Sequence, residues 1–98
     1  MGSVIIIATL KIKEGKMEEA IAVLKEVVPE VLKAEPGTLA YAPMTVRGAG
    51  NENTIIYYEK YEDVAAMKTH MGNLPKYSVK LGPLLDGPAD IKSCNEIL

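Results

Sequence analysis

Strand-type and helix-type hydrophobic patterns alternate along this 98-residue chain, and their order constrains the fold more than any single motif does. Stretches that are rich in β-branched residues or alternate with period two predict strands, and a 3.6-residue period predicts helices. With right-handed crossovers, the order strand, helix, strand, strand, helix, strand predicts an α+β fold. The fold expected is a ferredoxin-like βαββαβ sandwich whose antiparallel sheet has the strand order 4-1-3-2. The strands are expected at 4–12, 38–47, 54–62 and 89–97, and the helices at 16–33 and from 64 onward.

Two of these strands indicate their own position in the sheet. The first is apolar on both faces over residues 4–7, as a central strand should be. The strand at 38–47 contains Pro43, which cannot donate to a sheet ladder, so it is expected at an edge or at a bulge. Leu39 and Tyr41 are predicted to share one face of this strand. The residues of the first strand expected to face the helices are Ala8, Leu10 and Ile12.

Both helical stretches contain a proline. In the first, Pro29 predicts a kink or a break near Glu26, because proline lacks an N–H and clashes with the preceding turn. In the second, Asp63 is a good N-cap, and residues 72–75 (Gly-Asn-Leu-Pro) predict a break after Met71. The apolar stripe of the first helix is expected to be Met17, Ile21, Leu24, Val28 and Val31/Leu32. The stripes of the second are expected to be Val64, Met67 and Met71, then Tyr77, Leu81 and Leu84.

One face of the predicted sheet has no helix to cover it. Thr9, Met44, Ile56 and Tyr58 fall on that open face, and an exposed face of this kind predicts association. A homodimer that pairs the two open faces is the simplest arrangement that buries them.

Composition narrows the class of protein. The chain is long enough for a single domain, 1–98, with its own core. Its net charge of −2 argues against a nucleic-acid partner. One cysteine and one histidine exclude a disulfide framework and a multi-histidine metal site. No apolar run is long enough for a membrane span, so no membrane partner is expected, and the predicted location is cytoplasmic.

His70 is the main candidate for chemistry, because histidine is the side chain whose unperturbed pKa lies near neutrality. It could act as a general base or acid on a bound phenol or an enolisable carbonyl, or it could simply help to end a helix. Glu59 could orient His70 or hold a substrate hydroxyl, or it could make a structural hydrogen bond. Tyr57 and Tyr61 share the face of Glu59 and are either pocket residues or core residues.

Four stretches together resemble a known family. They are residues 8–16, residues 35–37 followed by Tyr41, residues 58–62, and His70 with Pro75, Tyr77, 83–85 and 87–88. This combination resembles the antibiotic biosynthesis monooxygenase family of the dimeric α+β barrel superfamily. The resemblance implies a homodimer whose sheets pack face to face, with a small-molecule pocket between helices and sheet in each subunit. It adds Tyr77 and Tyr41 to the substrate-binding candidates.

The resemblance implies more than one function. The first is a cofactor-independent monooxygenase that oxidises a small quinol or phenolic substrate with O2, needing neither a metal nor another cofactor. The alternatives are an isomerase of a small carbonyl metabolite and a non-catalytic module that binds a small molecule. Tyr61 stands where many members carry Trp. Ala8, Tyr61 and Lys80 stand where the haem-degrading branch has Asn, Trp and His, so haem degradation is not expected.

Overall fold

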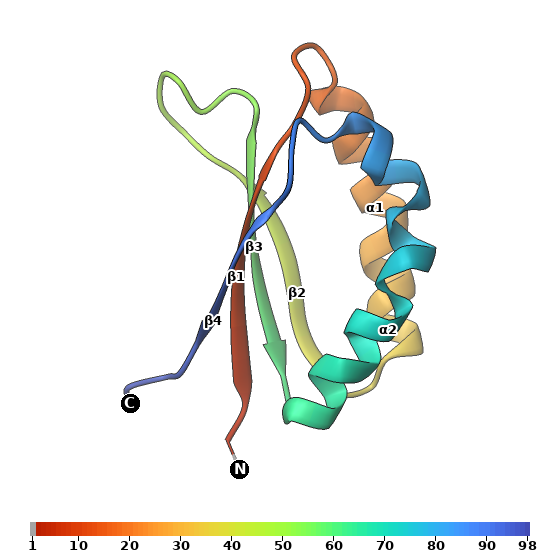
Figure 1. The fold of residues 1–98 in the computed structure, drawn as a ribbon, viewed down its shortest axis with the longest axis vertical. Helices are drawn as coiled ribbons and strands as arrows, with labels where there is room; N and C mark the ends of the chain where they lie inside the picture. The colour runs from red at the N-terminus through yellow and green to blue at the C-terminus, as the bar shows by residue number, and fades with distance from the viewer. Residues whose placement is uncertain (1) are drawn as a thin grey trace.

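A four-stranded antiparallel sheet with both helices on one face forms the fold (Figure 1). The computed structural model describes residues 2–98. The sheet order β2-β3-β1-β4 is the predicted order 4-1-3-2 counted from the opposite edge, so the expected ferredoxin-like fold is confirmed. The elements are β1 (Val4–Lys11), α1 (Met17–Ala34), β2 (Thr38–Thr45), β3 (Thr54–Tyr61), α2 (Val64–Leu81), a 3₁₀ turn η1 (Gly82–Leu84) and β4 (Asp90–Cys94).

The strands lie where their sequences place them. β1 is central, between β3 and β4, and β2 with its Pro43 is an edge strand. Ala8, Leu10 and Ile12 are buried on the helix-covered face, as period-two alternation predicts. Leu39 is a correction: it is 52% exposed and does not share the buried face of Tyr41. The register between β2 and β3 shifts between Thr38 and Ala40, and this irregularity turns Leu39 outward.

Neither proline breaks its helix. α1 is continuous through Pro29, so the predicted break near Glu26 does not occur. Its buried row is Ala20, Leu24, Val27 and Val31, and only Leu24 and Val31 belong to the predicted stripe. The apolar arc of α1 is wide, and Ala20 is small enough to let that side of the helix approach the sheet closely. Leu32, predicted to be inside, is 42% exposed.

The second helix also differs from expectation. α2 runs without interruption from Val64 to Leu81, although Asp63 caps it as predicted by accepting a hydrogen bond from the Ala66 N–H at 2.8 Å. Val64 and Met71 are both 51% exposed, so the predicted inner stripe is wrong. The buried residues of α2 are His70, Tyr77 and Leu81. Packing against the sheet therefore outweighs the local preference of residues 72–75 for a break.

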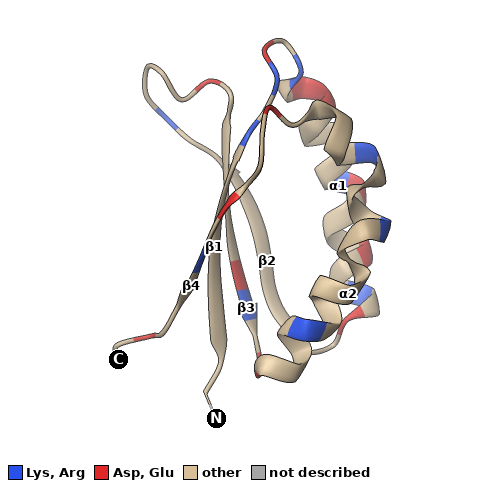
Figure 2. Ribbon diagram, viewed as in Figure 1, with Lys and Arg blue, Asp and Glu red and all other residues tan. Residues whose placement is uncertain are grey.

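The charges follow this arrangement. Figure 2 shows Lys, Arg, Asp and Glu mainly in the loops and along the outer sides of the helices. The core lies between the helices and the sheet, and Tyr41, Tyr57 and Tyr77 are part of it. No helix in residues 2–98 is long and apolar enough to cross a membrane.

Candidate functional site

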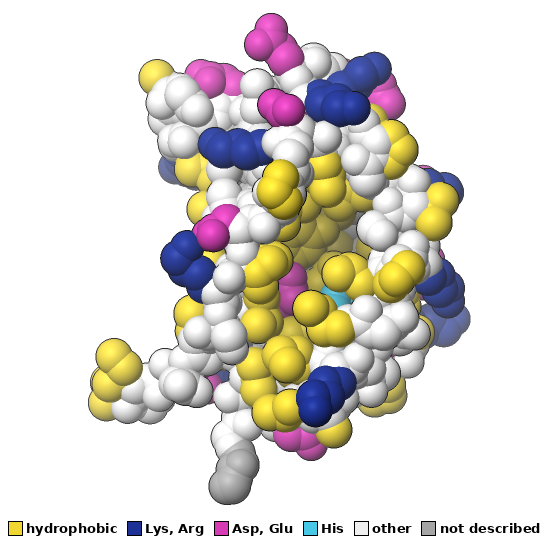
Figure 3. Space-filling view, in the orientation of Figure 1, with side chains coloured by type: hydrophobic (Ala, Val, Ile, Leu, Met, Phe, Trp, Pro, Cys, Tyr) yellow, Lys and Arg dark blue, Asp and Glu magenta, His cyan; other side chains and the backbone are white. Residues whose placement is uncertain are grey.

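A cavity of about 310 Å³ lies between α2 and the covered face of the sheet. Figure 3 shows this hollow, with mainly hydrophobic walls and the single histidine of the chain at its base. Four of the six predicted site residues line it: His70, Glu59, Tyr41 and Tyr57. The other lining residues are Ile6, Ala8, Leu10, Met71, Leu74, Ser78, Leu81, Leu85, Ala89 and Ile91.

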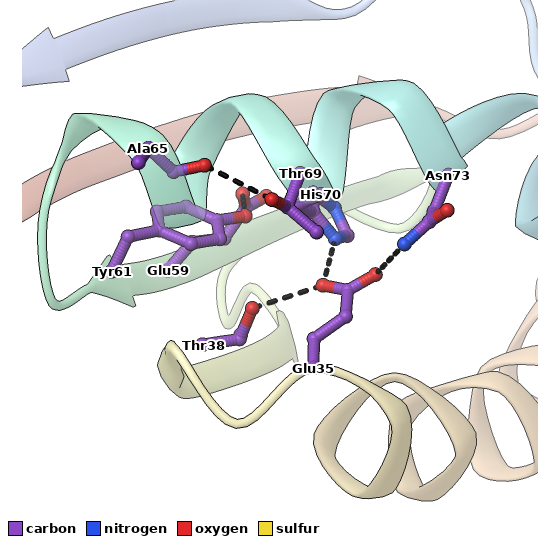
Figure 4. Close-up of polar contacts among 8 residues, drawn as sticks. All are labelled: Glu35, Thr38, Glu59, Tyr61, Ala65, Thr69, His70 and Asn73. Carbon is purple, nitrogen blue, oxygen red and sulfur yellow. Dashed lines mark hydrogen bonds and ion pairs between the residues drawn. The ribbon is translucent and has the colours of Figure 1, made fainter.

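His70 is held on the inner face of α2 with only 2% of its surface exposed. Its Nδ1 lies 2.8 Å from Oε1 of Glu35, a residue 35 positions earlier in the chain (Figure 4). Glu35 is also buried, at 3% exposure. The contact is therefore a buried carboxylate–imidazole pair, screened from solvent and directional.

Glu35 connects three elements of the fold. It is the C-cap residue of α1, and its carboxylate accepts hydrogen bonds from Thr38 Oγ1 at 2.9 Å and from Asn73 Nδ2 at 3.1 Å. The turn that carries it packs closely on α2. Gly37 lies so near Ala66 that a side chain at position 37 would place its Cβ only 2.6 Å from the Cβ of Ala66. Burial acts to raise the pKa of Glu35, but hydrogen bonds from Asn73, His70 and Thr38 outweigh it and lower that pKa.

This carboxylate determines which imidazole nitrogen carries the proton. With its pKa lowered, Glu35 is ionised at neutral pH and can only accept hydrogen bonds. The Nδ1 of His70 is therefore the donor, which leaves the lone pair of the neutral ring on Nε2. Within residues 2–98, Nε2 has no hydrogen-bond partner, and the ring lines the cavity. The pair can therefore present a base to a bound molecule.

Glu35 is not among the predicted site residues, although residues 35–37 form part of the family resemblance. One signal could have found it. An acidic residue at the C-terminal end of a helix faces the negative end of the helix dipole, where basic residues are favoured. Glu35 occupies this position directly after Ala34, so it must gain stabilisation from elsewhere.

Glu59 contacts a different partner from the one considered for it. Its Oε1 accepts a hydrogen bond from the Tyr61 hydroxyl at 2.5 Å, while His70 pairs with Glu35. Burial raises the pKa of Glu59, and the hydrogen bond from Tyr61 only partly opposes this effect. Glu59 thus keeps a proton to higher pH than an exposed carboxyl, and it lines the same cavity as His70.

Tyrosine rings surround the imidazole. The ring centroids of Tyr41 and Tyr61 lie 5.0 and 5.5 Å from that of His70, and the Tyr77 ring lies 6.3 Å away, stacked at 16°. Tyr61 and Tyr77 lie beside His70 but do not line the cavity. Burial raises the pKa of Tyr41, Tyr57 and Tyr61, so these phenols stay neutral hydrogen-bond donors.

Other hollows lie nearby, and one of about 290 Å³ adjoins Glu35 and Thr38 at the turn after α1. A larger and more open groove of about 790 Å³ runs between α1 and the β2–β3 hairpin, and neither His70 nor any acidic residue lines it. A very small cavity of about 30 Å³ lies behind the main one. It is lined by Leu24, Val27, Tyr41, Tyr57, Leu74, Tyr77, Ser78 and Leu81. In the described part of the chain, no group of three His, Cys, Asp or Glu side chains could hold a metal ion.

Comparison with known proteins relates this geometry to a family. A family model described as antibiotic biosynthesis monooxygenase matches residues 3–75. Two crystal structures, each called a "putative antibiotic biosynthesis monooxygenase", have similar folds. The one from Caulobacter crescentus is 26% identical with a TM-score of 0.86, and the match covers 99% of this chain and 92% of that one. The one from Bacteroides thetaiotaomicron is 22% identical with a TM-score of 0.82, covering 99% and 91%. No curated protein matches the sequence.

Proposed function

The chain belongs to the antibiotic biosynthesis monooxygenase family, and from this premise and the cavity geometry we propose that it is a cofactor-independent monooxygenase. Its substrate is a small quinol or phenol that reacts with O2, and the protein supplies a base. One observation carries the proposal. The Nδ1 of His70 is fixed by a buried carboxylate at 2.8 Å, and the same ring forms part of an apolar cavity.

The cavity limits the size and charge of the substrate. A cavity of about 150 Å³ holds one benzene ring, so a volume of about 310 Å³ suits roughly two fused rings. Among the described lining residues there is no Lys or Arg, and the acid or base side chains besides the neutral tyrosines are His70 and Glu59. With Glu35 ionised behind His70, the local potential favours a neutral phenol over a carboxylate or phosphate.

The proposed reaction needs no external reductant. Nε2 of His70 takes the phenol proton, and the substrate anion gives one electron to O2. The two radicals form a C–O bond at a ring carbon that carries hydrogen, and the peroxide takes up the proton from His70. Loss of the proton from that carbon then breaks the O–O bond. One phenol and one O2 yield one quinone and one water.

The neighbouring groups have supporting roles in this proposal. Glu35 stabilises the imidazolium that forms when His70 accepts the proton. Glu59, with its raised pKa, can donate a hydrogen bond to the substrate oxygen, and Tyr61 holds its carboxyl group in place. Tyr41 and Tyr57 present aromatic walls to a flat substrate.

The test is oxygen uptake by pure, metal-stripped protein with 1-naphthol as the phenol. We expect one O2 to be consumed per quinone formed, and catalase should return no O2, because the product is water and not hydrogen peroxide. The matched probe is 1-hydroxy-2-naphthoate, which has the same rings and an added carboxylate. It should react more slowly, because Glu35 is ionised behind His70 and no Lys or Arg lines the cavity to bind a carboxylate.

Two results would contradict the proposal. Oxygen uptake across a panel of neutral naphthols and quinols that does not exceed the rate in buffer would exclude the oxygenase. Exchange of substrate C–H for deuterium without O2 would then favour the isomerase, and tight binding without exchange would favour the binding module. Return of O2 by catalase would instead indicate an oxidase.

The proposal includes a homodimer formed through the open face of the sheet. Figure 1 shows that both helices lie on the other face. Ile56 pairs with Thr9 on one side and with Met44 on the other, and Tyr58 pairs with Ile7, so these side chains form one patch. Met44 is 46% exposed, and Ile56 and Tyr58 are half-buried.

Ile56→Lys should convert the dimer to a folded monomer. The change puts a charge near the centre of the patch, where a twofold axis would bring two lysines together. Sedimentation velocity at micromolar concentration should show the wild type at twice the mass of one chain. The control is Val79→Lys, because Val79 is 72% exposed and lies on α2, which covers the opposite face of the sheet. A wild-type monomer, or a dimer that survives Ile56→Lys, would refute this interface.

A further inference from the structure

The cavity of about 30 Å³ behind the main pocket has room for one very small molecule. It lies where both helices meet the sheet: Leu24 and Val27 come from α1, Leu74 and Leu81 from α2, and Tyr41 and Tyr57 from the sheet. A volume above roughly 10–15 Å³ can hold one water-sized molecule. A well-packed core leaves few voids of this size, so we ask what the small cavity beside the candidate site could hold.

The small cavity adjoins the substrate pocket. Tyr41, Tyr57, Leu74, Ser78 and Leu81 line both spaces. His70 is close to the shared wall, because its ring centroid lies 5.0 Å from that of Tyr41. A molecule in the small cavity would therefore lie beside a substrate ring whose hydroxyl faces His70.

The lining favours an apolar occupant over water. A buried water needs two to four polar partners. The walls are mainly aliphatic side chains and aromatic rings, and the Ser78 hydroxyl is already directed to the Pro75 carbonyl at 3.4 Å. Throughout residues 2–98, no fully buried side-chain N or O atom lacks a hydrogen-bond partner. Because aliphatic side chains and aromatic rings make up most of the lining, we compare this space with apolar cavities, which stay dry and bind apolar gases such as xenon.

We propose that this small cavity, framed by Leu24, Val27, Leu74 and Leu81, is a binding site for dioxygen. The inference rests on the proposed oxygenase function, since it assigns the place of the second substrate. The cavity holds O2 against the substrate ring while His70 removes the phenol proton. The anion gives one electron to O2 there, and the superoxide then moves into the main cavity, where the two radicals form the C–O bond, with the same balance of one phenol and one O2 to one quinone and one water.

Occupancy can be tested without turnover. Methyl NMR spectra of the intact protein are recorded under several bar of O2, which is paramagnetic and broadens nearby resonances. We expect the strongest broadening at Val27, which lines this cavity alone, with broadening also at Leu24 and Leu81, and much less at Ile12 and Val31. The two control residues are just as buried, at 1% and 0% exposure, but do not line the cavity. Equal broadening at all five residues would overturn the proposal.

Val27→Ile fills the cavity with one methylene group, and Val23→Ile is its control. Val23 lies on the same helix and packs on the core, but it does not line either cavity. Val27→Ile should remove the selective broadening and raise the KM for O2 about fivefold or more, with the dissociation constant for 1-naphthol unchanged. Val23→Ile should leave all three quantities as in the wild type, and urea unfolding midpoints report whether each variant is folded.

The outcomes separate the two proposals. If no phenol is turned over but O2 broadens the expected methyl groups, the oxygenase fails and the gas site stands. If turnover occurs and the broadening is absent, or if Val27→Ile leaves the KM for O2 unchanged, the gas site fails and the oxygenase stands.

Discussion

Replacing His70 with asparagine lowers oxygen uptake with 1-naphthol by about 100-fold or more and leaves the chain folded. General-base catalysis by a positioned side chain contributes roughly 10²–10⁴-fold, and the variant has no base to supply it. Asparagine is preferred to alanine because its amide N–H₂ can reach Oε1 of Glu35, as Nδ1 of His70 does. The buried carboxylate then keeps a donor, so we expect the free energy of unfolding to change by about 1 kcal/mol at most.

The pH dependence of this variant identifies the missing role. A phenol with a pKa near 10 ionises by itself as pH rises. The rate of His70→Asn should therefore increase about tenfold per pH unit towards that pKa, as the phenolate replaces the base. His70→Ala, which also loses the contact with Glu35, should be equally slow but less stable. A His70→Asn protein that keeps wild-type activity at neutral pH would show that His70 is not the base.

Replacing Glu35 with glutamine costs about 1–3 kcal/mol of stability at neutral pH. The carboxylate accepts hydrogen bonds from Thr38, His70 and Asn73, and an amide offers only one acceptor atom. One of the three donors therefore loses its partner. Because Glu35 links the end of α1 to β2 and α2, the loss affects all three elements. Urea denaturation at a series of pH values measures it.

The sign of the pH effect follows from the lowered pKa of Glu35. A carboxyl with a lowered pKa in the folded state adds stability above its ordinary value of 4.5, and this contribution is lost as pH falls through the folded-state pKa. The gap between the wild type and Glu35→Gln should therefore be largest at neutral pH and shrink in acid. A gap that does not change with pH would contradict an ionised Glu35.

Glu59→Gln is the matched control, because burial raises the pKa of Glu59 and the sign is reversed. A raised carboxyl pKa adds stability below the ordinary value, and this contribution is lost as pH rises through the folded-state pKa. Glu59→Gln should therefore gain stability relative to the wild type as pH increases.

In activity, Glu35→Gln should lower kcat by about tenfold or more with KM unchanged, since Glu35 positions His70 and does not touch the substrate.

The sequence predicted which strand residues share the face of the site, but not which side chains they contact. Alternation in β3 placed Tyr57, Glu59 and Tyr61 on one face, and the structure buries all three there. The hydrogen-bond partners in the site could not be predicted from alternation. The hydrogen bond between Tyr61 and Glu59 joins side chains two residues apart, whereas His70 and Glu35 meet only because the end of α1 packs on α2.

The sequence by itself determined the order of the elements, the central place of β1, the edge position of β2 and the cap at Asp63. These features follow from short-range rules: the period of a strand, the missing N–H of Pro43 and the geometry of a helix N-terminus. Only the tertiary structure decided that α2 stays whole, which row of α1 is buried and that Glu35 pairs with His70. Each of these depends on the packing of helices against the sheet, where burial of side chains such as Tyr77 and Leu81 outweighs local helix propensity.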